Sequence, residues 1–160
     1  MNIQAALSAV LTTACLGQIA VAEETPVEAF MGFGSWSGPC DAWGVQATCT
    51  ATWRTGLSPV LVVQEYAIVR TEDQAPIFAG RGLYRIVDGE VDGVWEDSRG
   101  VIQDLSGSYQ HGVLRVIWGE AQTEIGRSVY AWQDGALEAR DSVLTDDGWR
   151  DFMTIRYPAP

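Results

Sequence analysis

Short apolar or alternating runs follow one another along the chain from Phe30 onward, and residues that favour turns separate them. No stretch keeps apolar residues at the 3.6-residue spacing of an amphipathic helix, whereas alternation with a period of two is typical of strands. The pattern predicts ten strands, at residues 31–38, 45–54, 59–70, 76–87, 90–97, 100–109, 112–119, 122–133, 135–144 and 149–157.

Glycine-containing turns mark the predicted hairpins, because glycine tolerates the positive φ that a tight turn needs. These turns are Asp88-Gly89, Ser98-Arg99-Gly100, His111-Gly112, Asp134-Gly135 and Asp147-Gly148. Connections of this length join neighbouring antiparallel strands, so we expect the strands to follow one another as a meander.

Alternate residues of each strand form an apolar face that we expect to point inward. The clearest sets are Val91, Gly93, Trp95 and Asp97; Val101, Gln103, Leu105, Gly107 and Tyr109; Leu114, Val116 and Trp118; and Trp149, Asp151, Met153, Ile155 and Tyr157. An open meander would leave two long unpaired edges. The sequence therefore predicts an all-β fold, a closed antiparallel up-and-down β-barrel of about ten strands. A two-sheet sandwich is the alternative, but it needs long crossover connections.

The first 22 residues carry no charged side chain and are mostly apolar or small, which is typical of an export signal. Ala20-Val21-Ala22 before Glu23-Glu24 fits the pattern at which a signal peptidase cuts. We expect a signal peptide at residues 1–22, a single domain at residues 23–160, and a periplasmic or secreted protein with no membrane span after cleavage. Since no Lys or Arg precedes the apolar run, an uncleaved anchor is the alternative.

The net charge is −11, and all 10 basic residues are arginine. An acidic surface argues against nucleic acid as a partner, because phosphate binding depends on clustered positive charge.

Cys40 and Cys49 would be the two cysteines left after cleavage, and an even pair in an oxidising compartment predicts a disulfide. A two-cysteine metal site is the alternative. With a single histidine in the chain, we expect no metal site and no cofactor.

Two short segments resemble the calycin superfamily, which includes the lipocalins and fatty-acid-binding proteins: Gly34-Ser35-Trp36 and Thr154-Ile155-Arg156-Tyr157. Between them, Trp95-Glu96-Asp97-Ser98-Arg99-Gly100 and Ser106-Gly107-Ser108-Tyr109 are similar to an uncharacterised bacterial family of secreted calycin-like barrels. The resemblance implies that Trp36 and Arg156 stack as a plug at one end of the barrel. It implies a fold and no particular chemistry.

The residues predict no catalytic group. The only histidine, His111, lies in a predicted turn at the rim, which is a poor position for a Ser-His-Asp or Cys-His arrangement or for a haem ligand. Asp97 ends its strand facing inward, and we expect it to pair with Arg81, Arg85 or Arg127. Such an ion pair would either stabilise the fold or orient a ligand.

Seven tryptophans and five tyrosines suggest a binding function. Aromatic side chains can fill a core or line a cavity, and Trp53, Trp95, Trp118, Trp132 and Trp149 fall on predicted strands. The candidate ligand-binding residues are Trp95, Asp97, Gln103, Tyr109, Trp118 and Tyr130. Trp43 lies in the loop that the disulfide would span, where it could cover a cavity mouth or contact a partner.

Three functions fit these expectations. The first is binding of a small hydrophobic or amphipathic molecule inside the barrel. The second is a protein-interaction module, such as an inhibitor of a secreted hydrolase. The third is an isomerase or cyclase. An internal cavity would favour the first or third function, and a solid core the second.

Overall fold

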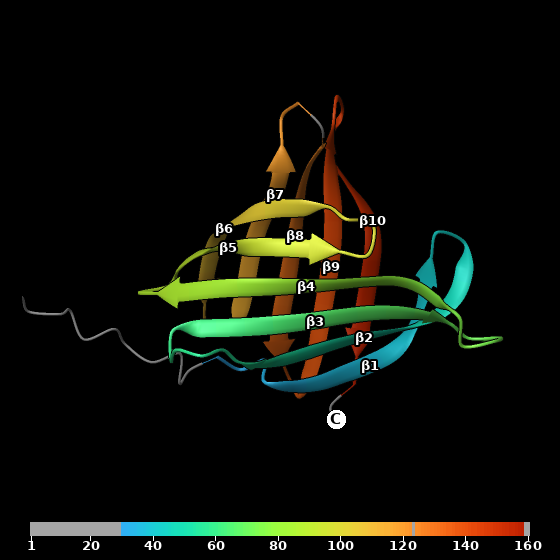
Figure 1. Cartoon of the computed structure of the whole chain (residues 1–160), viewed down its shortest axis with the longest axis horizontal. Helices are drawn as coiled ribbons and strands as arrows, with labels where there is room; N and C mark the ends of the chain where they lie inside the picture. Colours follow the sequence, from blue (N-terminus) through green and yellow to red (C-terminus); the bar gives the residue numbers. More distant parts are fainter. Residues whose placement is uncertain (1–29, 123, 159–160) are drawn as a thin grey trace, which may run out of the picture.

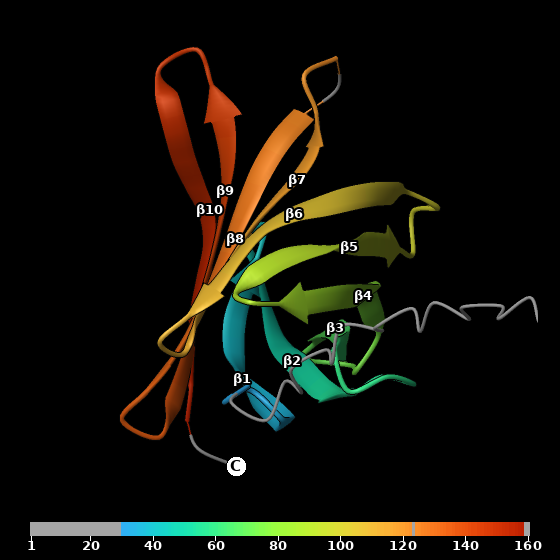
Figure 2. The same ribbon diagram turned by 90° about the vertical axis from the view of Figure 1, so that its left-hand side faces the viewer.

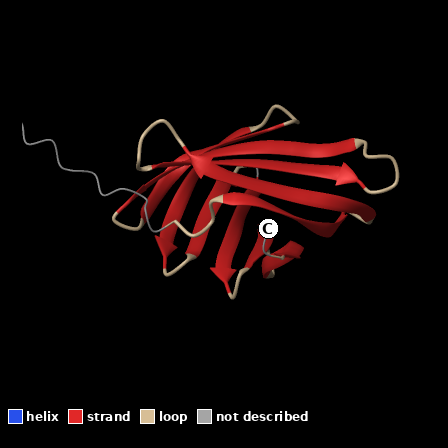
Figure 3. Ribbon diagram, turned by 90° about the horizontal axis from the view of Figure 1, so that it is seen from below, coloured by secondary structure: helices blue, strands red, loops and turns tan. Residues whose placement is uncertain are grey.

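The computed structural model describes residues 30–122 and 124–158, so the expected signal peptide at residues 1–22 lies outside the described residues. The ten strands are β1 (Gly34–Ala42), β2 (Val45–Thr55), β3 (Leu61–Arg70), β4 (Pro76–Val87), β5 (Glu90–Asp97), β6 (Ile102–Gln110), β7 (Val113–Glu120), β8 (Glu124–Gln133), β9 (Ala136–Thr145) and β10 (Gly148–Tyr157). Strands and short loops make up this part of the chain, which contains no helix (Figure 3).

Each strand pairs antiparallel with the next, in the order β1 to β10. The sheet coils so that β1 to β6 run across the front of Figure 1 while β7 to β10 stand nearly upright behind them. A Cβ built at Gly38 of β1 would lie 3.7 Å from the carbonyl oxygen of Arg156 in β10. The first strand therefore meets the last, as the turned view also shows (Figure 2), and the predicted up-and-down barrel is confirmed as a nearly closed one.

Within residues 30–122 and 124–158, four hairpins turn through two consecutive residues with positive φ, the geometry that matches the twist of the flanking strands. Three of them are the predicted turns Asp88-Gly89, His111-Gly112 and Asp134-Gly135. The fourth is Trp43-Gly44, with φ of 55° and 84°. Because the chain turns only there, β1 ends at Ala42 and not at residue 38, and it begins at Gly34 and not at residue 31 as predicted. The Asp41 carboxylate fastens this turn by accepting a 2.6 Å hydrogen bond from the Gly44 amide.

The inward face that the sequence predicts for β10 is only partly correct. A β-bulge between Asp151 and Met153 shifts the register of β10 against β9. Because the extra residue reverses the alternation, Met153, Ile155 and Tyr157 point inward as predicted, whereas Trp149 and Asp151 point outward. On the outer face the Arg127 guanidinium lies 4.5 Å from the Trp149 ring centre, and Ser142 donates a 2.7 Å hydrogen bond to Asp151.

The predicted stacking of Trp36 on Arg156 is also wrong. Trp36 is buried and donates its indole N–H to the Gly32 carbonyl oxygen at 2.9 Å. Arg156 lies on the outer face of β10, where its exposed guanidinium pairs with the Glu138 carboxylate. The two side chains occupy opposite faces of the sheet, so an ion pair on the surface replaces the cation–π contact.

One end of the barrel is packed with aromatic rings. Phe30 lies at the centre of this packed end, with ring-centre distances of 5.4 Å to Trp53, 5.1 Å to Tyr109 and 5.0 Å to Trp132. Trp53 also contacts Tyr130 at 5.1 Å. Trp53 and Trp132 therefore fill the core, and Tyr130 marks the boundary between the packed end and the rest of the interior.

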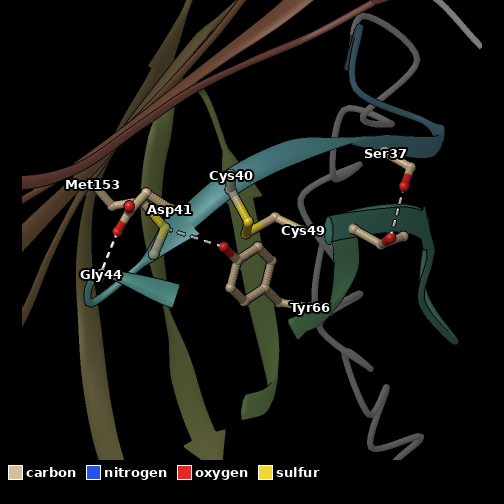
Figure 4. Close-up of a disulfide and its surroundings, with 8 residues drawn as sticks. Ser37, Cys40, Asp41, Gly44, Cys49, Tyr66 and Met153 are labelled. Atoms are coloured by element: carbon tan, nitrogen blue, oxygen red, sulfur yellow. Dashed lines mark hydrogen bonds between the residues drawn. A yellow bond between two sulfur atoms is a disulfide. The ribbon is translucent and has the colours of Figure 1, made fainter. Parts of the chain in front are cut away.

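The predicted disulfide joins Cys40 of β1 to Cys49 of β2 across the first hairpin. Both cysteines point inward and are buried. Figure 4 shows the disulfide beside Tyr66, whose hydroxyl donates to the Met153 sulfur at 3.2 Å. The disulfide thus links the two strands of the hairpin that carries Trp43 at its turn.

Replacing Cys40 and Cys49 together by alanine is expected to lower the free energy of unfolding by about 2–3 kcal/mol, because the bridge closes a short loop in the unfolded chain. Urea denaturation of the variant and of the oxidised wild type measures the difference. A decrease below about 0.5 kcal/mol, the size of an ordinary surface substitution, would contradict the role of the bridge.

Candidate ligand-binding site

A cavity of about 370 Å³ occupies the half of the barrel opposite the packed end. Side chains from β3 to β10 and from the β1–β2 turn contribute to its wall. The lining residues are Trp43, Tyr66, Ile68, Phe78, Tyr84, Trp95, Arg99, Gln103, Trp118, Glu124, Ser128, Tyr130, Ala139, Asp141, Val143, Arg150, Phe152, Met153, Ile155 and Tyr157. Most of the wall is aromatic or aliphatic, with a few polar groups, as in small-molecule sites generally.

Two glycines within strands make room for the tryptophans of this wall. A Cβ at Gly126 of β8 would lie 2.0 Å from the Trp118 ring, and a Cβ at Gly80 of β4 would lie 2.1 Å from the Trp95 ring. No larger residue fits at either position while the indoles stay in place. These glycines let the two rings lie flat against the neighbouring strands, so the cavity remains open between them.

Asp141 of β9 and Glu124 at the start of β8 are the carboxyl groups that line the cavity among the described residues, and Asp141 lies at its inner end. Ser128 of β8 donates a 2.6 Å hydrogen bond to Asp141 Oδ1, and Trp118 donates its indole N–H to the Ser128 oxygen at 3.1 Å. Burial disfavours the charged form and raises the pKa of Asp141 to about 6, although the bond from Ser128 acts in the opposite direction. Perturbed carboxyl groups of this kind cluster at functional sites.

Four tyrosines line the same cavity and interact electrostatically with this carboxyl group: Tyr66 of β3, Tyr84 of β4, Tyr130 of β8 and Tyr157 of β10. Burial is the largest cause that raises the pKa of each phenol, and the Asp141 charge adds to it in all four cases. The phenols therefore stay neutral at physiological pH. Together they provide hydroxyl groups and ring surfaces around a single ionisable carboxyl.

Hydrogen-bonding capacity remains unused beneath the cavity. Tyr84 donates a 2.6 Å hydrogen bond to Gln64 Oε1, but Gln64 Nε2 is buried without a partner. The Tyr157 hydroxyl is likewise buried and lacks a hydrogen-bond partner. The indole nitrogens of Trp53 and Trp132 in the packed end are also buried without a partner among the described residues, so unsatisfied groups occur in both halves of the barrel.

The mouth of the cavity is aromatic and charged. Trp43 lies over it, exposed, with its ring centre 6.3 Å from that of Phe78. The φ of Trp43, 55°, is the turn geometry of the β1–β2 hairpin, and it is uncommon for so bulky a residue. Arg99 lies 5.6 Å from the Phe78 ring centre, while Glu124 and Arg150 complete the rim.

Asp97 holds Arg99 in this position. Its carboxylate accepts hydrogen bonds from the Arg99 guanidinium at 2.6 and 3.1 Å and from the Arg99 amide at 2.8 Å. Burial raises the pKa of Asp97, but these bonds outweigh it and the pKa is lowered. The expected pairing with Arg81, Arg85 or Arg127 is wrong, because Arg81 pairs with Glu96, Arg85 with Asp92, and Arg127 stacks on Trp149.

Four of the six predicted ligand-binding residues line the cavity, namely Trp95, Gln103, Trp118 and Tyr130. Asp97 does not line it and acts through Arg99. Tyr109 belongs to the packed end, where its hydroxyl accepts a 3.0 Å hydrogen bond from the Met31 amide.

Sequence reasoning missed Asp141, Ser128 and three of the four tyrosines. The alternation of Leu137, Ala139, Asp141 and Val143 along β9 was the available signal, since it predicts an inward carboxyl group.

Clusters of metal-ligating side chains and membrane-spanning helices are both absent from the described residues. Residues 30–122 and 124–158 contain no cluster of three or more His, Cys, Asp or Glu side chains that could hold a metal ion. The same part of the chain has no helix of the length and hydropathy needed to cross a bilayer.

The barrel is similar to at least one solved structure. The crystal structure of Rv2717c from M. tuberculosis matches with a TM-score of 0.61 and 15% sequence identity, over 81% of this chain and 92% of that chain. At this identity the likeness shows the fold alone. No family model and no curated protein matches the chain, so the calycin resemblance of the sequence stays a prediction.

Asp141 is expected to make stability depend on pH. A carboxyl group whose pKa is about 6 when folded and lies near 4 when unfolded binds more protons in the folded state between these values. Below about pH 4 the Asp141 carboxyl group is protonated in both states and does not oppose folding. As the pH rises from there through about 6, the group lowers the free energy of unfolding by about 2–3 kcal/mol in total.

Asp141→Asn should remove this loss of stability, whereas Asp146→Asn, at an exposed turn carboxylate, should retain it. Urea unfolding of both variants and the wild type from pH 4 to pH 8 provides the test. If the free energy of unfolding depends on pH in the same way for the wild type and for Asp141→Asn, Asp141 is not held in a desolvated site.

Proposed function

We propose that this protein binds a small amphipathic molecule inside the barrel, as an exported carrier or receptor. The cavity of about 370 Å³ carries the proposal, because it is lined by aromatic rings with a few convergent polar groups. Its volume lies at the lower end of the range for ligand sites, which suits a molecule with one or two fused rings or a short aliphatic chain. The disulfide is compatible with a periplasmic or secreted location.

The cavity favours this function over a hydrolase inhibitor. An inhibitor acts through its outer surface and needs no hollow interior, whereas empty volume reduces stability. A function that uses the cavity explains why this volume is not filled.

An isomerase or cyclase is a second candidate for one reason. A general base works best when its pKa lies near the working pH, and the pKa of Asp141 is raised to about 6. A substrate of such an enzyme would bind in the same cavity, so the binding experiment that follows tests a step common to both functions.

N-phenyl-1-naphthylamine, an uncharged probe whose fluorescence rises in apolar sites, should bind the wild type with a stoichiometry of about one. Val143→Trp should abolish this binding, because Val143 lines the cavity and an indole there would fill it. The matched control is Leu144→Trp, since Leu144 is the next residue of β9 and is 45% exposed on the outer face.

Fluorescence titration measures the binding, and thermal unfolding verifies that both variants are folded. The proposal fails if the folded wild type does not bind the probe. It also fails if Val143→Trp binds the probe as well as Leu144→Trp does.

A further inference from the structure

The charges around the cavity leave one uncompensated negative group. At the mouth, the Arg99 guanidinium is bonded to the Asp97 carboxylate at 2.6 Å, so that pair is close to neutral. Glu124 and Arg150 carry opposite charges at the same rim. Asp141, which accepts its hydrogen bond from a neutral serine, has no cation as a hydrogen-bond partner. When ionised, it therefore gives the interior a net negative charge.

The aromatic residues around Asp141 also favour a positively charged ligand. Tyr66, Tyr84, Tyr130 and Tyr157 come from four different strands, and Trp118 reaches the carboxyl group through Ser128. Aromatic faces carry negative electrostatic potential and attract cations, most strongly in sites shielded from water. A carboxylate within a box of aromatic rings is thus suited to an ammonium group.

The charge of the whole protein adds to this preference. The net charge of −11 attracts cations toward the barrel and repels anions. Arg99 and Arg150 could suggest an anionic ligand, but both lie at the exposed rim, and Asp97 already accepts the hydrogen bonds of Arg99. An anion entering the cavity would approach Asp141 without a free cation at the inner end.

We propose that the ligand carries a protonated amine, which pairs with the Asp141 carboxylate inside the box formed by the four tyrosines and Trp118. This inference rests on the proposed binding function and names the chemical class of its ligand. The apolar body of the molecule extends toward the mouth, between Trp95, Phe78 and the Trp43 ring. An arylalkylamine, with an aromatic ring two or three bonds from its nitrogen, matches this arrangement.

Three indole compounds of similar size test the charge preference: tryptamine as the cation, indole-3-ethanol as the neutral analogue and indole-3-acetate as the anion. Their binding is measured by isothermal titration calorimetry and by displacement of N-phenyl-1-naphthylamine. Tryptamine should bind the wild type at least about tenfold more tightly than either of the other two at pH 7.5, because only the cation pairs with the carboxylate.

Asp141→Asn should remove this preference and leave the affinity for indole-3-ethanol within about twofold of the wild type. Asparagine retains an oxygen that can accept the bond from Ser128, so the site keeps its shape. Glu124→Gln serves as the matched control, because Glu124 is the carboxylate at the rim. The control should retain the preference.

The affinity for tryptamine should also weaken about tenfold between pH 7.5 and pH 5, as Asp141, with a pKa of about 6, becomes protonated. The groups that face it are the four tyrosines, which remain neutral over this range, and, toward the mouth, Arg99 with Asp97, Arg150 and Glu124. The pH effect should be absent in Asp141→Asn and present in Glu124→Gln.

The outcomes separate the two proposals. If N-phenyl-1-naphthylamine and all three indoles fail to bind, the binding function itself is overturned. If the naphthylamine binds but tryptamine shows no advantage, or indole-3-acetate binds best, only the amine is overturned. An advantage of tryptamine that persists in Asp141→Asn would overturn the role of the carboxylate.

Discussion

Closure of the sheet is the constraint from which the rest of this structure follows. Once ten antiparallel strands coil into a barrel, alternate residues of every strand point into the same enclosed space. That space must be filled with side chains or left as a cavity. This barrel does both: Phe30, Trp53 and Trp132 pack one end, and the other end encloses about 370 Å³ around Asp141.

The hollow half has two features that oppose stability. It contains volume that no side chain fills, and it holds a carboxyl group whose pKa burial raises. Filling this volume with aliphatic side chains would give a more stable barrel. Gly80 and Gly126, which make room for the Trp95 and Trp118 rings, help to shape the cavity instead. Trading stability for a polar site is the usual pattern at binding sites.

The fold was predictable because it depends on local signals. Strand alternation and positive-φ turns such as Asp134-Gly135 act over a few residues, and closure follows from the need to pair the edges. The predictions failed where one residue changes the geometry. The bulge before Met153 reverses the face of Trp149 and Asp151, and nothing in the alternation of β10 reveals it. Asp97 pairs with Arg99, two residues away in the predicted turn, because an aspartate that precedes a turn can bond to the backbone and side chain of the turn itself instead of to an arginine of a neighbouring strand.

The candidate site was predictable only in part, for a similar reason. An inward aromatic residue such as Trp118 can be identified from alternation, but whether it fills a core or lines a cavity depends on how eight strands meet. Tyr109 and Tyr130 are both inward tyrosines, yet one belongs to the packed end and the other faces Asp141. Their separation is set by the position of Phe30 and Trp53, which is a property of the assembled barrel.

The ionisation of the Asp141 side chain tests the central claim most directly. It can be followed by the ¹³C chemical shift of the carboxyl carbon during a pH titration. The structure predicts a pKa of about 6 in the free protein, and the amine proposal predicts a clear decrease when tryptamine is bound. A carboxyl group that titrates near 4 in the free protein, with no change on addition of tryptamine, would contradict the account.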